Sequence, residues 1–204
     1  MTMTIRHPDG WVGVPDYWPY PLEHGGTLDS PEEWATALAD QLAVIEILEP
    51  SARARLIEVL LAAARISATT GPRIYLGFVE GWSGPARVLN ATVRPRTEFG
   101  AMTIEQVAGV DDPAQLGPPF VEDVTTEEGR RGVRCFRYLP VGGDGAICGR
   151  LDYAFELGDD VLTITGGDVD LIEFEKLKLA AEAFVTAMRL DGQSSPSTPQ
   201  QPRE

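Results

Sequence analysis

The stretch from Gly132 to Asp168, GVRCFRYLPVGGDGAICGRLDYAFELGDDVLTITGGD, holds a glycine cluster, both cysteines of the chain and three arginines. A phosphate-binding loop needs a lysine followed by serine or threonine after its last glycine, at the start of a helix, and the cluster offers none of these. A dinucleotide-binding loop needs a third glycine where Cys148 stands. Glycines around an aspartate between two strands are typical of a hairpin turn, so we predict a turn that holds no cofactor.

The predicted turn decides which charged residues face each other across the hairpin. If Val141 faces Ala146, then Arg137 faces Arg150. Like charges directly opposite each other destabilise a sheet, so this pair needs a counter-charge or a bound anion. One interpretation is a salt-bridge cluster in which Asp152 and Glu156 supply the counter-charge. The other is a small anion-binding or ligand-binding patch made by Arg137, Arg150 and Asp152, with Arg134 as a further candidate.

The remaining reactive side chains form no recognisable site. In the predicted register Cys135 and Cys148 are four residues apart along the ladder, too far for a disulfide, so we expect two free thiols. The two histidines, His7 and His24, have no histidine or cysteine neighbours, so we predict no metal site. No nucleophile elbow, kinase motif set or zinc-protease motif occurs, and we identify no catalytic residue.

Four aromatic residues stand among prolines near the start of the chain, in GWVGVPDYWPYPLEHGG: Trp11, Tyr17, Trp18 and Tyr20. Proline-stiffened aromatic side chains offer a large contact area at small entropic cost, which suits a patch that binds a partner. The same residues can instead belong to an N-terminal arm, residues 1–28, that packs over the sheet. An exposed apolar patch of that size is unusual on a monomer, which favours packing.

Periodicity predicts the elements that position these residues. Ser30 and Glu33 are predicted to cap a first helix, whose core-facing stripe consists of Trp34, Leu38, Leu42, Ile45 and Leu48. A second helix is predicted over residues 52–67. Six β-branched and aromatic runs predict strands, with a helical turn at 103–109. A last helix is predicted to begin at Asp170 and Glu173. Its core-facing side consists of Leu171, Phe174, Leu177, Ala181, Phe184 and Met188.

The order of these elements predicts an α+β fold. We expect a mostly antiparallel β-sheet of about six strands, packed by two N-terminal helices and one C-terminal helix. The elements fit one domain over residues 1–190. Residues 191–204 contain Ser, Thr, Pro and Gln without an apolar anchor, which predicts a disordered tail.

Charge restricts the partners. Seventeen basic residues against 31 acidic residues give a net charge of -14, which repels nucleic-acid phosphates and anionic lipid surfaces. No apolar run approaches the ~20 residues of a membrane-spanning helix, and the first residues lack the pattern of a signal peptide. We therefore expect a cytoplasmic protein that binds neither nucleic acid nor membrane.

The segment GVRCFRYLPVGGDGAICGRLDYAFELGDDVLTITGGDVDLIEFEKLKLAAEAFVTAM consists of a Gly-Val-Arg strand, a tight hairpin, a strand of the LDYAFEL type and an ITGGD strand leading into a closing helix. In this order it resembles the small α/β proteins of actinobacteria with a Mog1/PsbP-like fold, and the opening GWVGVPDYWPYP is similar to sequences of actinobacterial proteins. The resemblance covers about residues 72–190 and carries no catalytic signature. Members of that fold mostly serve as binding or assembly factors, which implies such a role here.

These observations support three hypotheses. The first is a non-enzymatic binding or accessory protein that contacts a protein partner through one sheet face or the aromatic arm, because the core pattern is intact and no catalytic group accompanies it. The second is a small enzyme or anion-ligand-binding protein centred on Arg137, Arg150 and Asp152. The third is a structural accessory of a phage-like or secretion assembly, to which the acidic surface and the polar tail point.

Overall fold

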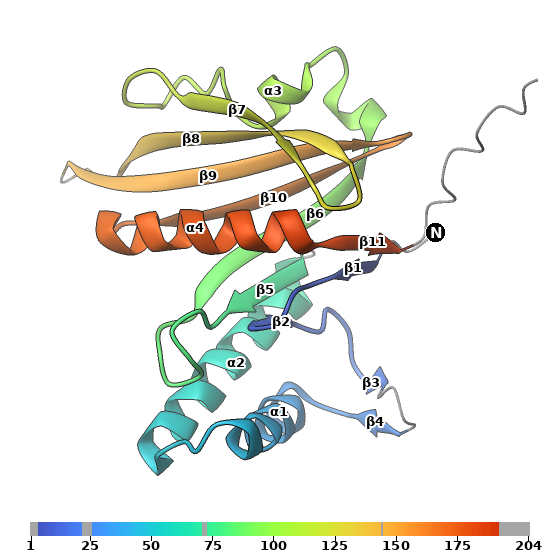
Figure 1. Cartoon of the computed structure of the whole chain (residues 1–204), viewed down its shortest axis with the longest axis vertical. Coiled ribbons are helices and arrows are strands. Elements are labelled where there is room, and N and C mark those ends of the chain that lie inside the picture. Colours follow the sequence, from blue (N-terminus) through green and yellow to red (C-terminus); the bar gives the residue numbers. More distant parts are fainter. Residues whose placement is uncertain (1–3, 22–25, 71–72, 144, 192–204) are drawn as a thin grey trace, which may run out of the picture.

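An antiparallel sheet organises the molecule (Figure 1). The computed structural model describes residues 4–21, 26–70, 73–143 and 145–191. Over these ranges seven strands pair in antiparallel fashion in the order β2 Trp11–Gly13, β5 Arg73–Gly77, β6 Arg87–Pro95, β10 Asp160–Asp168, β9 Ala146–Leu157, β8 Arg131–Val141 and β7 Phe120–Thr125. The predicted α+β class is confirmed, and the strand beyond the expected six, β2, comes from the aromatic arm.

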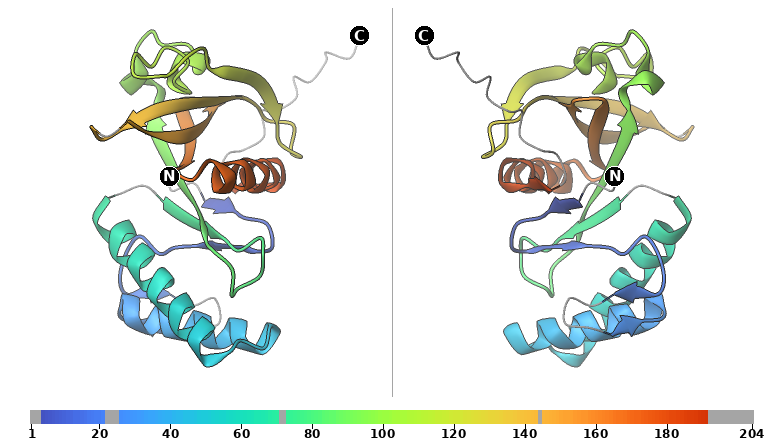
Figure 2. Two further views of the ribbon diagram at one scale, coloured as in Figure 1. Left: turned by 90° about the vertical axis from the view of Figure 1, so that its left-hand side faces the viewer. Right: turned by 90° about the vertical axis from the view of Figure 1, so that its right-hand side faces the viewer.

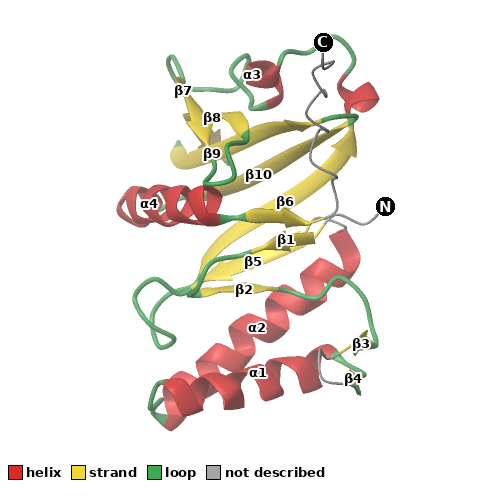
Figure 3. Ribbon diagram, turned by 45° about the vertical axis from the view of Figure 1, so that its right-hand side comes forward, coloured by secondary structure: helices red, strands yellow, loops and turns green. Residues whose placement is uncertain are grey.

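One face of the sheet is covered by the helix α4, Leu171–Ala187 (Figures 1 and 3). The helix begins at the predicted cap, because the Asp170 carboxylate accepts hydrogen bonds from two N–H groups of the first turn. The predicted capping box with Glu173 is not formed, because the N–H of Asp170 donates to Asp168 instead. Gly149 on β9 lets the helix approach closely, since a Cβ there would overlap the Phe174 ring. The largest core cluster fills this layer; from the helix it includes Phe174, Leu177, Ala181, Phe184 and Met188.

The opposite face is covered at one end by two helices that pack on β2 and β5, α1 Pro31–Ile45 and α2 Pro50–Thr70 (Figure 2). Ser30 caps α1 as predicted by accepting from the N–H of Glu33. The Glu33 carboxylate accepts from the N–H of Asp29, one residue earlier than in the usual capping box. The second core cluster lies here; its helical members include Trp34, Ala35, Ala39, Leu42, Leu56, Leu60, Ala63 and Ala64.

The same face is covered at its other end by a short helix, α3 Ile104–Val107, at the predicted helical turn. Thr103 and Gln106 form a complete capping box around it. A 3-10 turn, η1 Arg96–Phe99, lies between β6 and this helix. A small third core cluster joins the helix to β8 and β9; it consists of Ala108, Val133, Cys135 and Ala154.

The hairpin of β8 and β9 has the predicted register. Val141 lies opposite Ala146, and the partners along the two strands follow from that pair. Gly142 and Gly145 have φ values of 67° and 80°, a conformation that favours glycine, while the aspartate between Gly143 and Gly145 lies outside the described residues. A strand follows the loop, so the glycine cluster is the turn that the sequence predicts.

The N-terminal arm is folded onto the rest of the chain. β1 Thr4–Arg6 pairs with β11 Arg189–Asp191 and β2 pairs with β5, while β3 Tyr20–Pro21 and β4 Thr27–Leu28 pair with each other within the arm. The folded region therefore includes Asp191, one residue past the predicted boundary at 190. The rest of the predicted disordered tail lies outside the described residues.

Candidate functional site

Arg137 and Arg150 face each other across β8 and β9, and a carboxylate lies between them. Asp152 Oδ2 is 3.0 Å from Arg137 Nη1, and Asp152 Oδ1 is 3.0 Å from Arg150 Nη2. Arg137 Nε also lies 3.3 Å from Asp112 Oδ2, and Arg137 Nη1 donates to the carbonyl oxygen of Ala108 at 2.9 Å. Asp152 and Asp112 thus supply the counter-charge that the register requires. The predicted contribution of Glu156 is wrong, because its carboxylate lies 3.5 Å from Arg96 Nε instead.

Burial gives this cluster a structural role. The side chains of Arg137 and Asp152 each expose 8% of their surface. Gly109 lies so close that a Cβ there would overlap the guanidinium of Arg137. Burial raises the pKa of Asp152, while the neighbouring arginines act in the opposite direction. The cluster therefore ties the α3 segment to the sheet. Arg150, whose side chain is 39% exposed, is the member most accessible to an anion. Anion binding at Arg150 stays a prediction.

The third arginine of the hairpin, Arg134, lies on the other face of the sheet, towards α4. Its guanidinium pairs with Glu122, and Nη1 lies 3.2 Å from Glu182 Oε2 on α4. Because alternate residues of a strand point to opposite faces, Arg134 cannot join Arg137 in one patch. Its two carboxylates already supply its counter-charge.

The other reactive groups are dispersed. Cys135 and Cys148 are free thiols, as predicted, and burial raises the pKa of Cys135, which makes it a poor nucleophile. His7 lies in the arm, and His24 is not among the described residues. Within the described ranges, no three His, Cys, Asp or Glu side chains are grouped so that they could hold a metal ion. No helix in the same ranges is both long and apolar enough to cross a membrane.

The four aromatic residues of the arm differ in their surroundings. Trp11 exposes 5% of its surface and packs on Phe184 with ring centroids 4.8 Å apart. Trp18 and Tyr20 are half-buried against the core of α1 and α2. Tyr17 is 55% exposed. Trp11 is therefore a core residue with almost no surface for a partner, and Tyr17 is the most accessible of the four.

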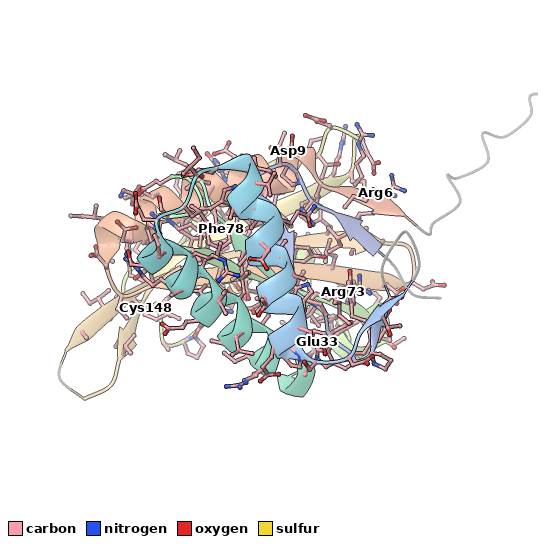
Figure 4. All side chains as sticks on the ribbon, turned by 90° about the horizontal axis from the view of Figure 1, so that it is seen from below. Arg6, Asp9, Glu33, Arg73, Phe78 and Cys148 are labelled. Atoms are coloured by element: carbon pink, nitrogen blue, oxygen red, sulfur yellow. The ribbon has the colours of Figure 1, made fainter. Side chains whose placement is uncertain are left out.

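A cavity of about 760 Å³ lies between the arm, β1 and the start of β5, and we call it the arm cavity. This volume lies within the range of small-molecule sites. Figure 4 shows Arg6 and Arg73 on the same side of the molecule. The polar and aromatic residues that line the cavity are Arg6, His7, Asp16, Tyr17, Tyr20, Arg73 and Tyr75. No sequence motif joins them, because β1 and β5 come together only in the fold.

The α1–α2 turn, the β5–β6 loop and the start of α4 lie on the side of the molecule away from the arm (Figures 1 and 3), and each of them carries exposed aliphatic side chains. Contacts link the three segments: Glu46 accepts from the N–H of Trp82 at 3.1 Å, and Glu80 lies 2.9 Å from Lys176 Nζ. We call this surface the apolar end, and it consists of Val44, Ile45, Ile47, Val79, Val169, Leu171 and Ile172.

Two residues of the apolar end were expected in the core. Ile45 is 72% exposed and Leu171 is 44% exposed, so their predicted places on core-facing stripes are wrong. α1 ends at Ile45, and the chain turns towards α2 before that side chain can reach the sheet. The sequence does hold a signal, because VIEILE crowds more aliphatic residues into 44–49 than one stripe can bury.

No protein-family model matches this chain, and no curated protein matches it. Two surface features therefore bear on function. They are the arm cavity on one side of the molecule and the apolar end on the other.

Proposed function

We propose that this chain is a non-enzymatic binding or accessory protein that contacts a protein partner through the apolar end. The observation that carries the proposal is the exposure of large aliphatic side chains: 97% for Ile47, 86% for Val44 and 72% for Ile172. Burying such a side chain contributes about 1.5–3 kcal/mol, and the fold leaves that contribution unused here. Grouped exposed aliphatic residues are typical of protein interaction sites.

The charges of the apolar end indicate the chemistry of the partner. The segments 44–49, VIEILE, and 168–173, DVDLIE, contain two and three carboxylates, five together, and no lysine or arginine. A complementary surface is apolar at its centre and basic at its rim. The net charge of -14 would also attract a basic partner from a distance.

The resemblance of residues 72–190 to the Mog1/PsbP-like fold supports the same class, because members of that fold mostly serve as binding or assembly factors. We propose that the protein acts in the cytoplasm. We also propose that it binds no nucleic acid, because its net negative charge repels phosphate groups. A role as a structural accessory of a phage-like or secretion assembly stays a prediction, as does a small enzyme or anion-ligand-binding protein centred on Arg137, Arg150 and Asp152.

Site-specific photo-crosslinking in the native cell tests the proposal. A benzophenone amino acid replaces Ile47 in one variant and Leu179 in the control; Leu179 is 71% exposed on α4 but lies outside the apolar end. We expect one protein to be crosslinked from position 47 and not from position 179. Equal crosslinking from both positions would show that the apolar end has no special partner.

Binding with purified components then measures the contribution of the apolar end. Ile47→Asp places a charge in the centre of the proposed interface, so we expect the Kd for the crosslinked protein to rise by about tenfold or more. Leu179→Asp is the matched control and should leave the Kd unchanged. An Ile47→Asp variant that binds as tightly as the control would remove the apolar end from the interface.

A further inference from the structure

The arm cavity differs in charge from the rest of the chain. Among its lining residues Arg6 and Arg73 carry positive charge and Asp16 carries negative charge, whereas the whole chain has a net charge of -14. Concave surfaces concentrate the field of the charges that line them. The two arginines therefore make this cavity a favourable place for an anion.

Arg73 is the cationic group placed to hold such an anion. Its Nε lies 3.7 Å from Asp16 Oδ2, which is longer than a hydrogen bond, and its side chain is 30% exposed. A guanidinium carries five N–H donors in a planar fork that matches a carboxylate or a phosphate. The guanidinium also hydrogen-bonds the Tyr75 side chain, and these two contacts engage only some of its five donors, which leaves others for a ligand.

The floor of the cavity is held in place by the core. Tyr75 exposes 3% of its surface and packs on Phe184 with ring centroids 5.1 Å apart. The His7 ring lies edge-on to Tyr75 at 6.0 Å, and its Nε2 accepts a hydrogen bond from the N–H of Gly13 at 3.3 Å. Burial raises the pKa of Tyr75, against the opposing effect of Arg73, so the phenol stays protonated at neutral pH. A site fixed in advance loses little entropy when a ligand binds.

The outer wall of the cavity is aromatic. The rings of Tyr17 and Tyr20 have centroids 6.2 Å apart at an interplanar angle of 52°. Tyr17 is 55% exposed, so one of its faces is open to a ligand. Aromatic side chains favour stacked or edge-to-face contact with another flat ring.

We propose that the arm cavity binds a planar aromatic anion, a ring that carries a carboxylate or a phosphate. The anionic group lies on Arg73, and the ring lies against Tyr17 and Tyr20. The volume of about 760 Å³ accommodates a metabolite-sized molecule. The site is separate from the apolar end and does not depend on the protein-binding role.

Titration calorimetry of the full chain with phenyl phosphate tests this site. We expect phenyl phosphate to bind about tenfold more tightly than inorganic phosphate, which lacks the ring, or benzyl alcohol, which lacks the charge. Arg73→Met should weaken phenyl phosphate about tenfold or more. The matched control is Arg53→Met, because Arg53 pairs with Asp40 between α1 and α2, far from the cavity.

Tyr17→Ala keeps the test decisive if loss of Arg73 disturbs folding, because Tyr17 is the exposed member of the wall. It should weaken phenyl phosphate several-fold and leave inorganic phosphate unchanged. Ile47→Asp should change neither, which separates this site from the protein-binding role. Equal affinity for phenyl phosphate and inorganic phosphate, or binding that Tyr17→Ala does not alter, would overturn the proposal.

Discussion

Arginines occur in two contrasting settings in this molecule. Arg137 is 8% exposed and has carboxylate oxygens at 3.0 and 3.3 Å and a carbonyl oxygen at 2.9 Å. Arg73 is 30% exposed, and its carboxylate contact is at 3.7 Å. The contacts of the first arginine lie inside the fold. The second also hydrogen-bonds the Tyr75 side chain but keeps part of its guanidinium exposed. The arginine pair that stands out in the sequence, Arg137 with Arg150, therefore builds structure. Arg73, which no sequence pattern singles out, lines a cavity.

The largest expected effect comes from removing the buried arginine. Arg137→Met should lower the free energy of unfolding by about 3 kcal/mol, because the buried Asp152 and the part-buried Asp112 lose a positive partner. Urea denaturation at pH 7 measures the change. Arg73→Met, the contrasting variant, should change stability by less than about 1 kcal/mol, since its pair is partly exposed. Similar losses in both variants would erase the distinction between the two settings.

Alanine substitution of two glycines, one beside Arg137 and one at the arm cavity, should give the next largest effect on stability. Gly109 has φ +89°, and a Cβ there would overlap the Arg137 guanidinium, so Gly109→Ala should destabilise the fold by about 2 kcal/mol. Gly13 borders the arm cavity, and a Cβ there would meet Tyr75 and His7 at ordinary distances of 3.5 and 3.6 Å. Gly13→Ala should therefore be almost neutral in thermal unfolding. A destabilised Gly13→Ala variant would show that the cavity is packed more tightly than its contacts indicate.

The buried arginine cluster could be predicted from the sequence because it depends on local geometry. A hairpin turn of glycines fixes the register of the two strands that it joins, and the register then places Arg137 opposite Arg150 and next to Asp152. Helix caps are also local, which is why the starts at Ser30 and Asp170 were predicted. The contribution of Asp112 was missed, because it depends on how the α3 segment packs on the sheet.

The arm cavity could not be predicted, since its walls come from distant parts of the chain. β1 reaches its position by pairing with β11 at the other end of the described chain, and no local pattern encodes that contact. The surroundings of Trp11 have the same origin, because the indole packs on Phe184 of α4. The apolar end was missed for another reason: periodicity marks which residues could share a stripe, but it does not show where the helix leaves the core.

The smallest effect at neutral pH concerns a tyrosine beside the third arginine. Tyr153 lies opposite Arg134 and exposes 1% of its surface; its hydroxyl interacts with the Arg134 guanidinium but makes no hydrogen bond of regular geometry among the described residues. Tyr153→Phe should therefore change stability at pH 7 by less than about 1 kcal/mol, because the buried hydroxyl that is removed has only this poorly aligned partner. A clear loss of stability would indicate that the hydroxyl has a further partner, such as an ordered water.

The same substitution should have a larger effect in alkali. Burial raises the pKa of Tyr153 to about 12, whereas a tyrosine in the unfolded chain titrates near 10. Between about pH 10 and 12 the unfolded chain loses this proton and the folded chain keeps it, so stability falls as pH rises, by up to about 1.4 kcal/mol per pH unit. Tyr153→Phe should lack this component in urea denaturation at pH 8 and pH 11, while Tyr17→Phe, at an exposed position, should retain it. If the stability of the wild-type chain and of Tyr153→Phe fell equally between pH 8 and pH 11, water would have to reach the phenol. The surroundings of Arg134 would then be open to solvent, like those of Arg73, and not closed, like those of Arg137.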